Sequence, residues 1–432
     1  MNPQNTNISS ISSENPQHDV AKHNCRGKFW RTLFIGFFCV TAFLAAYEAR
    51  LFERIAAHWE IPSGTLDGKF SDQNFNLVLN QTVADLNRLK PLNRTETSDY
   101  GPVEKLFREG FGKRKLNPSH ALLAIGIAAS QPATNSSAFA ALEEYCARNV
   151  TADGTPVPDL RVTDDFTAGE VFLEMYQRTG KDSYHTGAHN MAHWLMAYPT
   201  NKLGTLSYRV EHPDVLMVDD KGMICGFLIR YGAAFGDADA LNLGVRQLRI
   251  FLQRSLNEST GLPYHAYDLR LDRKFGPDTW LRGIGWLAMG LADALTYLPK
   301  DHEARAEFAI ALTKMLETLR TYQEPDGCWR WDVNNPVAEL DTSGTAMIAY
   351  AVEKAVQAGA IDSSWQTLSE NALRGILRHT HPNGLVDQAL AECNGVGHYA
   401  KSFKPSNYAQ GPALALFALV QQRHANLNQT AH

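Results

Sequence analysis

The chain has 432 residues, of which 44% are hydrophobic and 20% charged, and its formal net charge is −5. This composition is typical of a folded globular protein with enough apolar mass for a large core. The acidic balance and the lack of a clustered basic stripe argue against a nucleic-acid partner.

The first 50 residues are expected to lie outside the main fold. Residues 1–28 are rich in Asn, Ser, Gln and Pro and are predicted to form a disordered tail. Within residues 29–50, the uncharged run TLFIGFFCVTAFLAAY (32–47) would span roughly 24 Å as a helix. We predict a transmembrane signal anchor here, with a cleaved signal peptide or a buried core helix as alternatives. Residues 51–70 would form a linker.

The charges that flank this run predict its orientation. Lys22, Arg26, Lys28 and Arg31 all lie on its N-terminal side or at its edge. Positive residues stay on the cytoplasmic side of a membrane helix. We therefore expect a single-pass membrane protein with a cytoplasmic N-terminus. Its main domain would be periplasmic or extracellular, or would face a secretory lumen in a eukaryote.

Residues 71–428 are predicted to form one all-α domain, an (α/α)6 barrel. Apolar residues recur at a spacing of three to four in twelve segments, which pair through loops rich in Gly, Pro and aromatic residues. An open helical solenoid is the alternative, although no sequence repeat of solenoid length is visible. The twelve predicted helices are 74–90, 118–130, 135–149, 165–179, 183–197, 220–235, 238–256, 282–298, 302–322, 342–358, 364–380 and 408–424.

The loops of this barrel hold the residues that carry chemistry. Loops at one end of such a fold are where a site is expected, and aromatic faces with charged groups suit a sugar. The residues of interest lie in Asp164-Asp165, Asp219-Asp220, GLPYHAYD (261–268), DTWLRGIGW (278–286), DGCWRWD (326–332) and SNYAQGP (406–412).

Five ordered motifs resemble glycoside hydrolase families 105 and 88, the unsaturated rhamnogalacturonyl and unsaturated glucuronyl hydrolases. Their order and spacing extend from about residue 115 to 420. The motifs are DDFTAGEVFLEMYQRTGKDSY (164–184), MVDDKGMICGFLIRYGAAFGD (217–237), LPYHAYD (262–268), WLRGIGWLAMGLADAL (280–295) and, taken together, DGCWRWDVNNP with DTSGTAMIAYAVEKAV (326–336, 341–356).

The resemblance implies an unusual hydrolysis. The substrate would be an oligosaccharide whose non-reducing end is a 4,5-unsaturated uronic acid left by a polysaccharide lyase. A carboxylic acid would protonate C4 of the double bond and water would add at C5, after which the hemiketal opens and releases the aglycone. This differs from the attack at the anomeric carbon made by ordinary two-carboxylate glycosidases.

The resemblance also assigns the carboxylates. Asp219 matches the catalytic Asp, with Asp220 as the rival, and consecutive helix residues point about 100° apart, so one of the two should face the pocket. Asp164 matches a second carboxylate that orients the sugar, with Asp165 as its alternate. Helix capping is the alternative role for each of these acids.

Other residues are expected to bind the substrate. His265 matches a substrate-contact histidine, and Tyr264 precedes it in the same motif. Arg282 and Trp286 are four residues apart and would share one helix face, the Arg as a fork for hydroxyls or the carboxylate and the Trp as a stacking plate. Packing in the core is the alternative for every Trp. The remaining candidates are Trp280, Trp329, Trp331, Asn407, Tyr408 and Gln410.

No metal and no cofactor are expected. His185, His189 and His193 repeat every four residues, a spacing that can bind a metal, but no carboxylate or cysteine nearby in the sequence completes the set. A packed or solvated helix face is the favoured interpretation. The six cysteines include no C-x-x-C pair, and the four in the main domain can form disulfides only in an oxidising compartment.

Two departures from the family pattern concern the substrate. Met217 stands where the family has a Trp two residues before the catalytic Asp, and residues 70–115 match poorly. The rival functions are an ordinary inverting glycosidase or a polysaccharide lyase on the same barrel, and a non-catalytic glycan-binding membrane protein in polysaccharide assembly.

Overall fold

The computed structural model of the chain describes residues 36–41, 62–88, 118–151, 153–156, 163–393 and 395–430. The chain divides into two units, one of residues 1–61 with 95–112 and one of residues 62–94 with 113–432. In the first unit the described residues 36–41 are helical. The predicted tail, the rest of the predicted anchor and residues 51–61 of the linker lie outside the described residues. In the described part of the chain, no helix combines the length and apolar character needed to cross a membrane.

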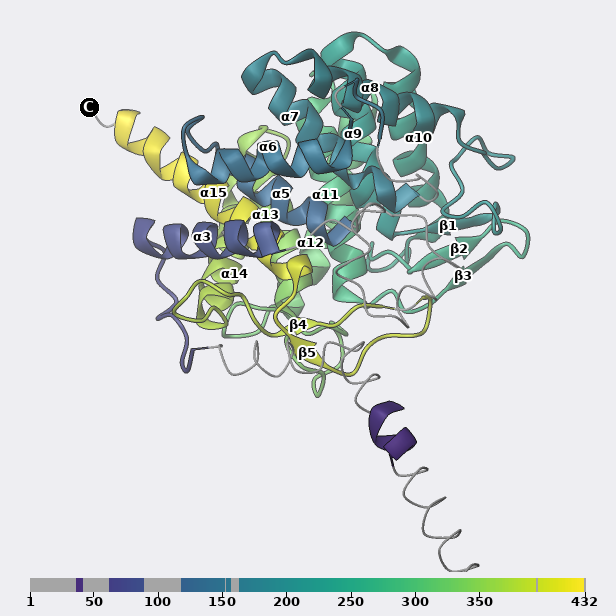
Figure 1. Cartoon of the computed structure of the whole chain (residues 1–432). Helices are drawn as coiled ribbons and strands as arrows, with labels where there is room; N and C mark the ends of the chain where they lie inside the picture. Colours follow the sequence, from purple (N-terminus) through teal and green to yellow (C-terminus); the bar gives the residue numbers. More distant parts are fainter. Residues whose placement is uncertain are drawn as a thin grey trace, which may run out of the picture. The chain divides into compact units, whose positions relative to one another are not determined.

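The second unit is built from helices at the twelve predicted places (Figure 1). Their bounds agree with the predicted ranges to within a few residues, except that the last helix extends six residues further. Within the described residues they are α3 (Asp72–Arg88), α5 (Pro118–Ala129), α6 (Ser137–Asn149), α7 (Gly169–Thr179), α8 (Asp182–Ala197), α9 (Asp219–Phe235), α10 (Ala238–Ser255), α11 (Leu281–Tyr297), α12 (Ala304–Tyr322), α13 (Thr342–Gln357), α14 (Gln366–Arg378) and α15 (Asn407–Thr430). Two 3-10 helices, η2 (Thr163–Ala168) and η3 (Ser363–Trp365), precede α7 and α14.

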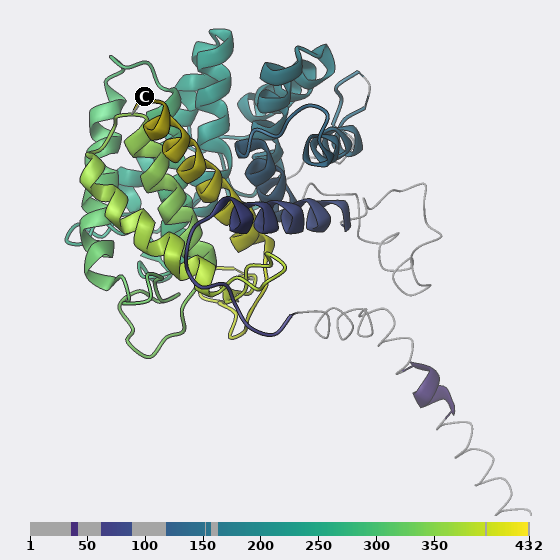
Figure 2. The same cartoon turned by 90° about the vertical axis from the view of Figure 1, so that its left-hand side faces the viewer.

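The helices form an inner ring and an outer ring. The inner helices α5, α7, α9, α11, α13 and α15 pack in that order, and α15 packs back onto α5, so the ring closes. α15 packs beside α5 and α13 (Figures 1 and 2), although residues 130–406 separate it from α5 in the sequence. The closed ring excludes the open solenoid, and the predicted helical barrel is confirmed.

Small residues let the inner helices approach closely. A side-chain carbon at Gly290 of α11 would lie 2.2 Å from the backbone oxygen of Lys221 in α9, which is far inside contact distance. The first fifteen residues of α11 are all buried, as expected for a helix surrounded by neighbours. The N-terminus of α9 is therefore fixed by direct contact between two backbones.

Side-chain caps begin several helices where the sequence places an Asp or Ser. Asp237 accepts from the amide of Ala240 and caps α10. The cap of α13 is Asp341, which accepts from Ser343 and Gly344 amides. Thr342 and Ser343 already lie inside the helix.

Short antiparallel strands cover the end of the barrel where the inner helices begin. Strands β1 (Val215–Met217), β2 (Ala266–Asp268) and β3 (Arg273–Phe275) form one sheet in that order, with Met217 opposite Ala266. β4 (Ala389–Leu390) pairs with β5 (Phe403–Lys404). These strands are two or three residues long, too short to give a period-two signal, and the sequence did not predict them.

Charged side chains from four inner helices interact with one another about 16 Å along α9 from Asp219. Arg230 of α9 pairs with Glu170 and Glu174 of α7 at 2.8 and 2.7 Å. Lys354 of α13 pairs with Asp293 of α11. Burial opposes the charge on Arg230, but the acids beside it outweigh burial and raise its pKa. Four inner helices are joined by this network, named here the axial ion network.

All the described cysteines are free thiols. They are Cys39, Cys146, Cys225, Cys328 and Cys393.

Candidate active site

Asp219 and His265 meet where the first sheet joins α9. β1 ends two residues before Asp219, and the amide of Val218 donates to the backbone oxygen of His265 at 2.9 Å. This pairing brings His265 Nε2 to 3.2 Å from Asp219 Oδ2. The Asp219 side chain keeps 16% of its surface exposed, whereas that of His265 keeps 2%. Asp219 is thus the more exposed member of the pair.

Aromatic rings hold His265 on its other side. Its Nδ1 lies 2.6 Å from the hydroxyl of Tyr399, and its ring centroid lies 4.4 Å from that of Trp280. The ring of Trp331 approaches Tyr399 at 5.8 Å. With one ring nitrogen at a carboxylate and the other at a phenol, the orientation of the imidazole is fixed, and the partner of each nitrogen sets its tautomer.

Asp164 lies in η2, which packs against α9. Its Oδ2 accepts a 2.6 Å hydrogen bond from the hydroxyl of Tyr208. Burial and the negative charges of Asp164 and Asp219 raise the pKa of Tyr208, so this phenol stays protonated and continues to donate. Because both carboxylates act on Tyr208, the structure brings together the two acids that were predicted as catalytic.

Tyr408 also lies among the charged groups of the site. Burial raises its pKa, and the charges that also act on it are Glu392, Arg282, Asp164 and Asp219. Its hydroxyl lies 3.4 Å from Glu392 Oε1. The site therefore combines two carboxylates with a histidine and a rim of tyrosines.

The geometry does not favour the expected contact of Arg282 with a sugar. The guanidinium is buried and donates to the backbone oxygens of Leu390 and Ala391 at 2.7 and 3.0 Å and to Ser343 Oγ at 3.2 Å. It also lies over the rings of Trp280 and Tyr408. Arg282 is a positioning residue that ties the β4 segment to the site.

Asp220 points away from Asp219, because consecutive residues of a helix point about 100° apart. It is buried, and its Oδ1 lies 2.6 Å from Nζ of Lys221, itself fully buried. Burial raises the pKa of Asp220, against the opposing charge of Lys221. Asp165 is likewise fully buried. For both acids, the structure favours a role in the fold over the predicted contact with substrate.

Three further aromatic candidates are placed in packing positions. Trp286 is buried over Gly222 and meets the ring of Tyr408 edge-on at 6.3 Å. Trp329 is fully buried and donates from Nε1 to the backbone oxygen of Leu319. Tyr264 is half-buried with the ammonium of Lys274 over its ring. Core packing, the alternative considered for the tryptophans, describes Trp286 and Trp329 better than sugar stacking.

Of the last-loop candidates, only Tyr408 joins the acids. Gln410 is buried and accepts from the amide of Val386. Asn407 lies near Ser119 at 3.5 Å.

Two of the three histidines of α8 pack against aromatic residues, whereas His193 is exposed and lies 3.8 Å from Asp237 Oδ2. His189 Nδ1 bonds the hydroxyl of Tyr231 at 2.7 Å, and the rings of His185 and Phe235 meet edge-on at 4.7 Å. Burial and the two neighbouring histidines lower the pKa of His189. Among the described residues, these histidines do not belong to any cluster of three metal-ligating side chains.

Tyr208 and Tyr399 were missed in the sequence. Both lie in irregular segments, without a periodic pattern or a matching motif around them. A loop tyrosine flanked by Gly and His, as in GVGHYA (395–400), is a weak signal that gains meaning only from its contact with His265.

The closed helical barrel carries two carboxylates, a histidine and tyrosines at one end, a combination of groups that suits the binding of a sugar. Residues 112–424 match the family described as Glycosyl Hydrolase Family 88. The chain belongs to this family and is a glycoside hydrolase.

Relatives agree with this assignment. The chain is 24% identical over 315 residues to an unsaturated rhamnogalacturonyl hydrolase of Bacillus subtilis, covering 70% of this chain and 89% of the relative. A solved structure from Klebsiella pneumoniae, a possible member of glycoside hydrolase family 105, superposes with a TM-score of 0.71 at 18% identity and covers 82% of this chain and 94% of its own. A family 105 hydrolase of C. acetobutylicum gives 0.64 at 21% identity, covering 74% and 98%. These two structures share the fold.

Proposed function

We propose that the chain removes a 4,5-unsaturated uronic acid from the non-reducing end of lyase-generated oligosaccharides. The single observation that carries the proposal is the partly exposed Asp219, 3.2 Å from a buried His265, at the position matching the catalytic Asp of the family. The name of the Bacillus subtilis relative, an unsaturated rhamnogalacturonyl hydrolase, supports the same class of substrate.

In the proposed reaction, the carboxyl group of Asp219 gives its proton to C4 of the C4–C5 double bond. Water adds its oxygen to C5 and returns its proton to the Asp219 carboxylate. The product is a hemiketal, whose ring opens to give a ketone at C5 and a hemiacetal at C1. The hemiacetal then collapses to an aldehyde at C1 and releases the aglycone as an alcohol. No group of the enzyme attacks the anomeric carbon.

The other residues have supporting parts in this scheme. His265 holds the Asp219 carboxyl in one orientation through Nε2 and is itself held by Tyr399. Asp164, fixed by Tyr208, accepts hydrogen bonds from sugar hydroxyls. Tyr408 and the exposed Glu392 line the approach of the sugar. Positioned groups of this kind raise the rate by reducing reorganisation during the proton transfer.

The test follows the ultraviolet absorbance of the double bond in a panel of lyase-generated oligosaccharides. The proposed enzyme removes the absorbance, whereas a polysaccharide lyase would create it on saturated polymer. Asp219→Asn keeps the shape of the side chain but cannot donate the proton, so we expect a rate loss of about a thousandfold or more. Unchanged turnover in that variant would disprove the assignment.

We also propose that the N-terminal segment attaches the enzyme to a membrane with the barrel on its outer side. The support is the apolar run at 32–47 and the positive residues around its start. Full-length protein should sediment with membranes and resist a high-salt wash, and a chain that starts at residue 62 should not. Release of the full-length protein by salt alone would contradict the proposal.

A further inference from the structure

A hollow lies outside the active site, between α12 and α14. Its volume is about 590 Å³. The loop after α12 covers one side of it, and the start of α14 forms another. Its lining includes Arg320, Gln323, Glu324, Asp326, Trp365 and Arg374, with Arg378 at the end of α14. We name it the α12–α14 pocket.

Three arginines make this pocket positive. Arg374 and Arg378 are one turn apart on α14, and both are exposed, as is Arg320 on α12. Arg320 lies over the ring of Trp365 at 5.0 Å, and Arg378 donates to the backbone oxygen of Asp326 at 3.3 Å. Within the described part of the chain, none of the three forms a salt bridge with a carboxylate.

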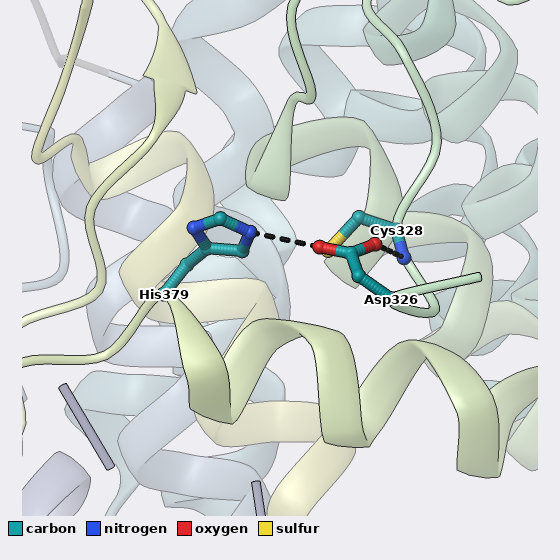
Figure 3. A group of neighbouring side chains, drawn as sticks. All are labelled: Asp326, Cys328 and His379. Carbon is teal, nitrogen blue, oxygen red and sulfur yellow. Dashed lines mark hydrogen bonds and ion pairs between the residues drawn. The ribbon is translucent and has the colours of Figure 1, made fainter. Parts of the chain in front are cut away.

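The two acids at the pocket already have partners. Glu324 pairs with Nε of Arg330 at 2.7 Å. Asp326 receives His379 Nε2 at 3.0 Å and the amide of Cys328 at 2.8 Å, as Figure 3 shows. Burial opposes its charge, but these hydrogen bonds and the charges of His379 and Arg378 outweigh burial and lower the pKa of Asp326. Arg374 donates to the side-chain oxygen of Asn371, and neither Arg320 nor Arg374 has a carboxylate partner among the described residues.

The three side chains drawn in Figure 3, Asp326, Cys328 and His379, do not favour a metal ion. Asp326, Cys328 and His379 place one ligand-type atom each within 4.8 Å of one another. A metal binds the thiolate, yet burial raises the pKa of the Cys328 thiol well above its usual value. Arg378 beside Asp326 would also repel a cation. The trio instead fixes the loop that carries Asp326.

We propose that the α12–α14 pocket is a second binding site for a uronate-containing sugar chain. Guanidinium groups bind carboxylates through paired hydrogen bonds, and Arg374 and Arg378 are spaced one turn apart to do so. Ser364 and Thr367 add exposed hydroxyls that match those of a sugar, and Trp365 adds an apolar surface. The carboxylate specificity rests on the proposed function, in which the substrate is an acidic oligosaccharide.

One loop connects this pocket with the active site. Residues 323–340 begin at the pocket, and Glu324 pairs with Arg330 within the loop. The next residue, Trp331, lies against Tyr399, which in turn bonds His265. A chain held in the pocket is therefore bound by the same loop that borders the catalytic pair. The second site retains long acidic chains, while a disaccharide occupies the active site alone.

The test compares R374A/R378A with R246A, which removes an exposed arginine from another outer helix, α10. Each full-length protein is run in native gels that contain saturated polygalacturonate or neutral dextran. Wild type and R246A should be retarded by polygalacturonate and not by dextran, and R374A/R378A should need about tenfold more polymer for the same retardation. Equal retardation of all three proteins, or retardation by dextran, would overturn the proposal.

Kinetics separate this proposal from the proposed function. R374A/R378A should raise KM for long lyase-generated oligosaccharides by about tenfold and leave KM for an unsaturated disaccharide unchanged. A parallel change for both substrates would contradict a remote site. The gel assay uses a saturated polymer and is repeated with Asp219→Asn, so it reports on the pocket even if the chain does not hydrolyse unsaturated sugars.

Discussion

His265 Nε2 lies 3.2 Å from Asp219 Oδ2, although 46 positions separate the two residues in the sequence. The contact depends on the pairing of β1 with β2, which sets Met217, two residues before Asp219, opposite Ala266, the residue after His265. A shift of one residue in this register would turn His265 to the other face of the sheet. The geometry of the Asp219–His265 pair thus depends on a three-residue strand.

Tyr399→Phe should show how much the orientation of His265 contributes to the rate, because His265 itself is kept. The change removes the hydroxyl at Nδ1 and leaves the ring, so we expect kcat to fall about tenfold, equivalent to one hydrogen bond of about 1.4 kcal/mol. The pH dependence of kcat should also change shape, because the tautomer of His265 is no longer fixed. Tyr322→Phe, at an exposed tyrosine of α12, is the control. An identical pH profile would argue that Tyr399 only fills space.

Asp219→Asn and Asp220→Asn should give opposite results. Asp220 is half of a buried pair with Lys221, and loss of one partner leaves an uncompensated buried charge, so Asp220→Asn should lower the free energy of unfolding by about 3 kcal/mol. Its kcat should stay within a few-fold of wild type. Asp219→Asn should lose the rate and keep the stability. Urea unfolding and turnover, measured on both variants, check the pair of expectations.

Arg282→Lys should weaken the enzyme without removing a charge. Lysine cannot hold the backbone oxygens of Leu390 and Ala391 together, so the β4 segment is less firmly placed. We expect a loss of about 2 kcal/mol in stability and about tenfold in kcat/KM. Arg246→Lys, at an exposed site, should change neither quantity. A change in KM alone, with unchanged stability, would instead favour direct contact of Arg282 with substrate.

His120 should make the fold sensitive to mild acid. Burial, aided by the charge of Arg148, lowers the pKa of this histidine in α5 from 6.5 to about 4. Above pH 6.5 both folded and unfolded chains hold it neutral, and its contribution is complete. Between pH 6.5 and 4 the unfolded chain takes up a proton that the folded chain does not, so stability falls as the pH falls. The shift corresponds to at most about 3 kcal/mol, reduced because His120 is only half-buried.

The check is the melting temperature of His120→Gln between pH 4 and 7. The variant should lose less stability on acidification than wild type, whereas His212→Gln, at an exposed histidine, should behave like wild type. Parallel curves for all three proteins would show that His120 does not carry the effect.

The helices could be predicted because each buries a long apolar face, and a period of three to four is then visible over many residues. The closure of the ring could not be read from this pattern, because it depends on contacts between α5 and α15 at opposite ends of the barrel sequence. The short strands give no period at all. They nevertheless decide which side chain meets Asp219.

The candidate site was predictable where a motif and a helix terminus coincide, as at Asp219 and Asp164. Spacing alone was less informative. Arg282 and Trp286 do share a helix face, but that face is turned into packed neighbours and not toward an open sugar site. Tyr208 and Tyr399 act through hydrogen bonds made across 44 and 134 positions. No local sequence pattern indicates hydrogen bonds between residues so far apart in the chain.

The axial ion network has a consequence for how the barrel is held together. Glu170, Arg230, Asp293 and Lys354 come from α7, α9, α11 and α13, so one set of interacting charges links four inner helices far from Asp219. Removing one member would leave its partner's charge uncompensated in the interior, and four helices would feel the loss at once.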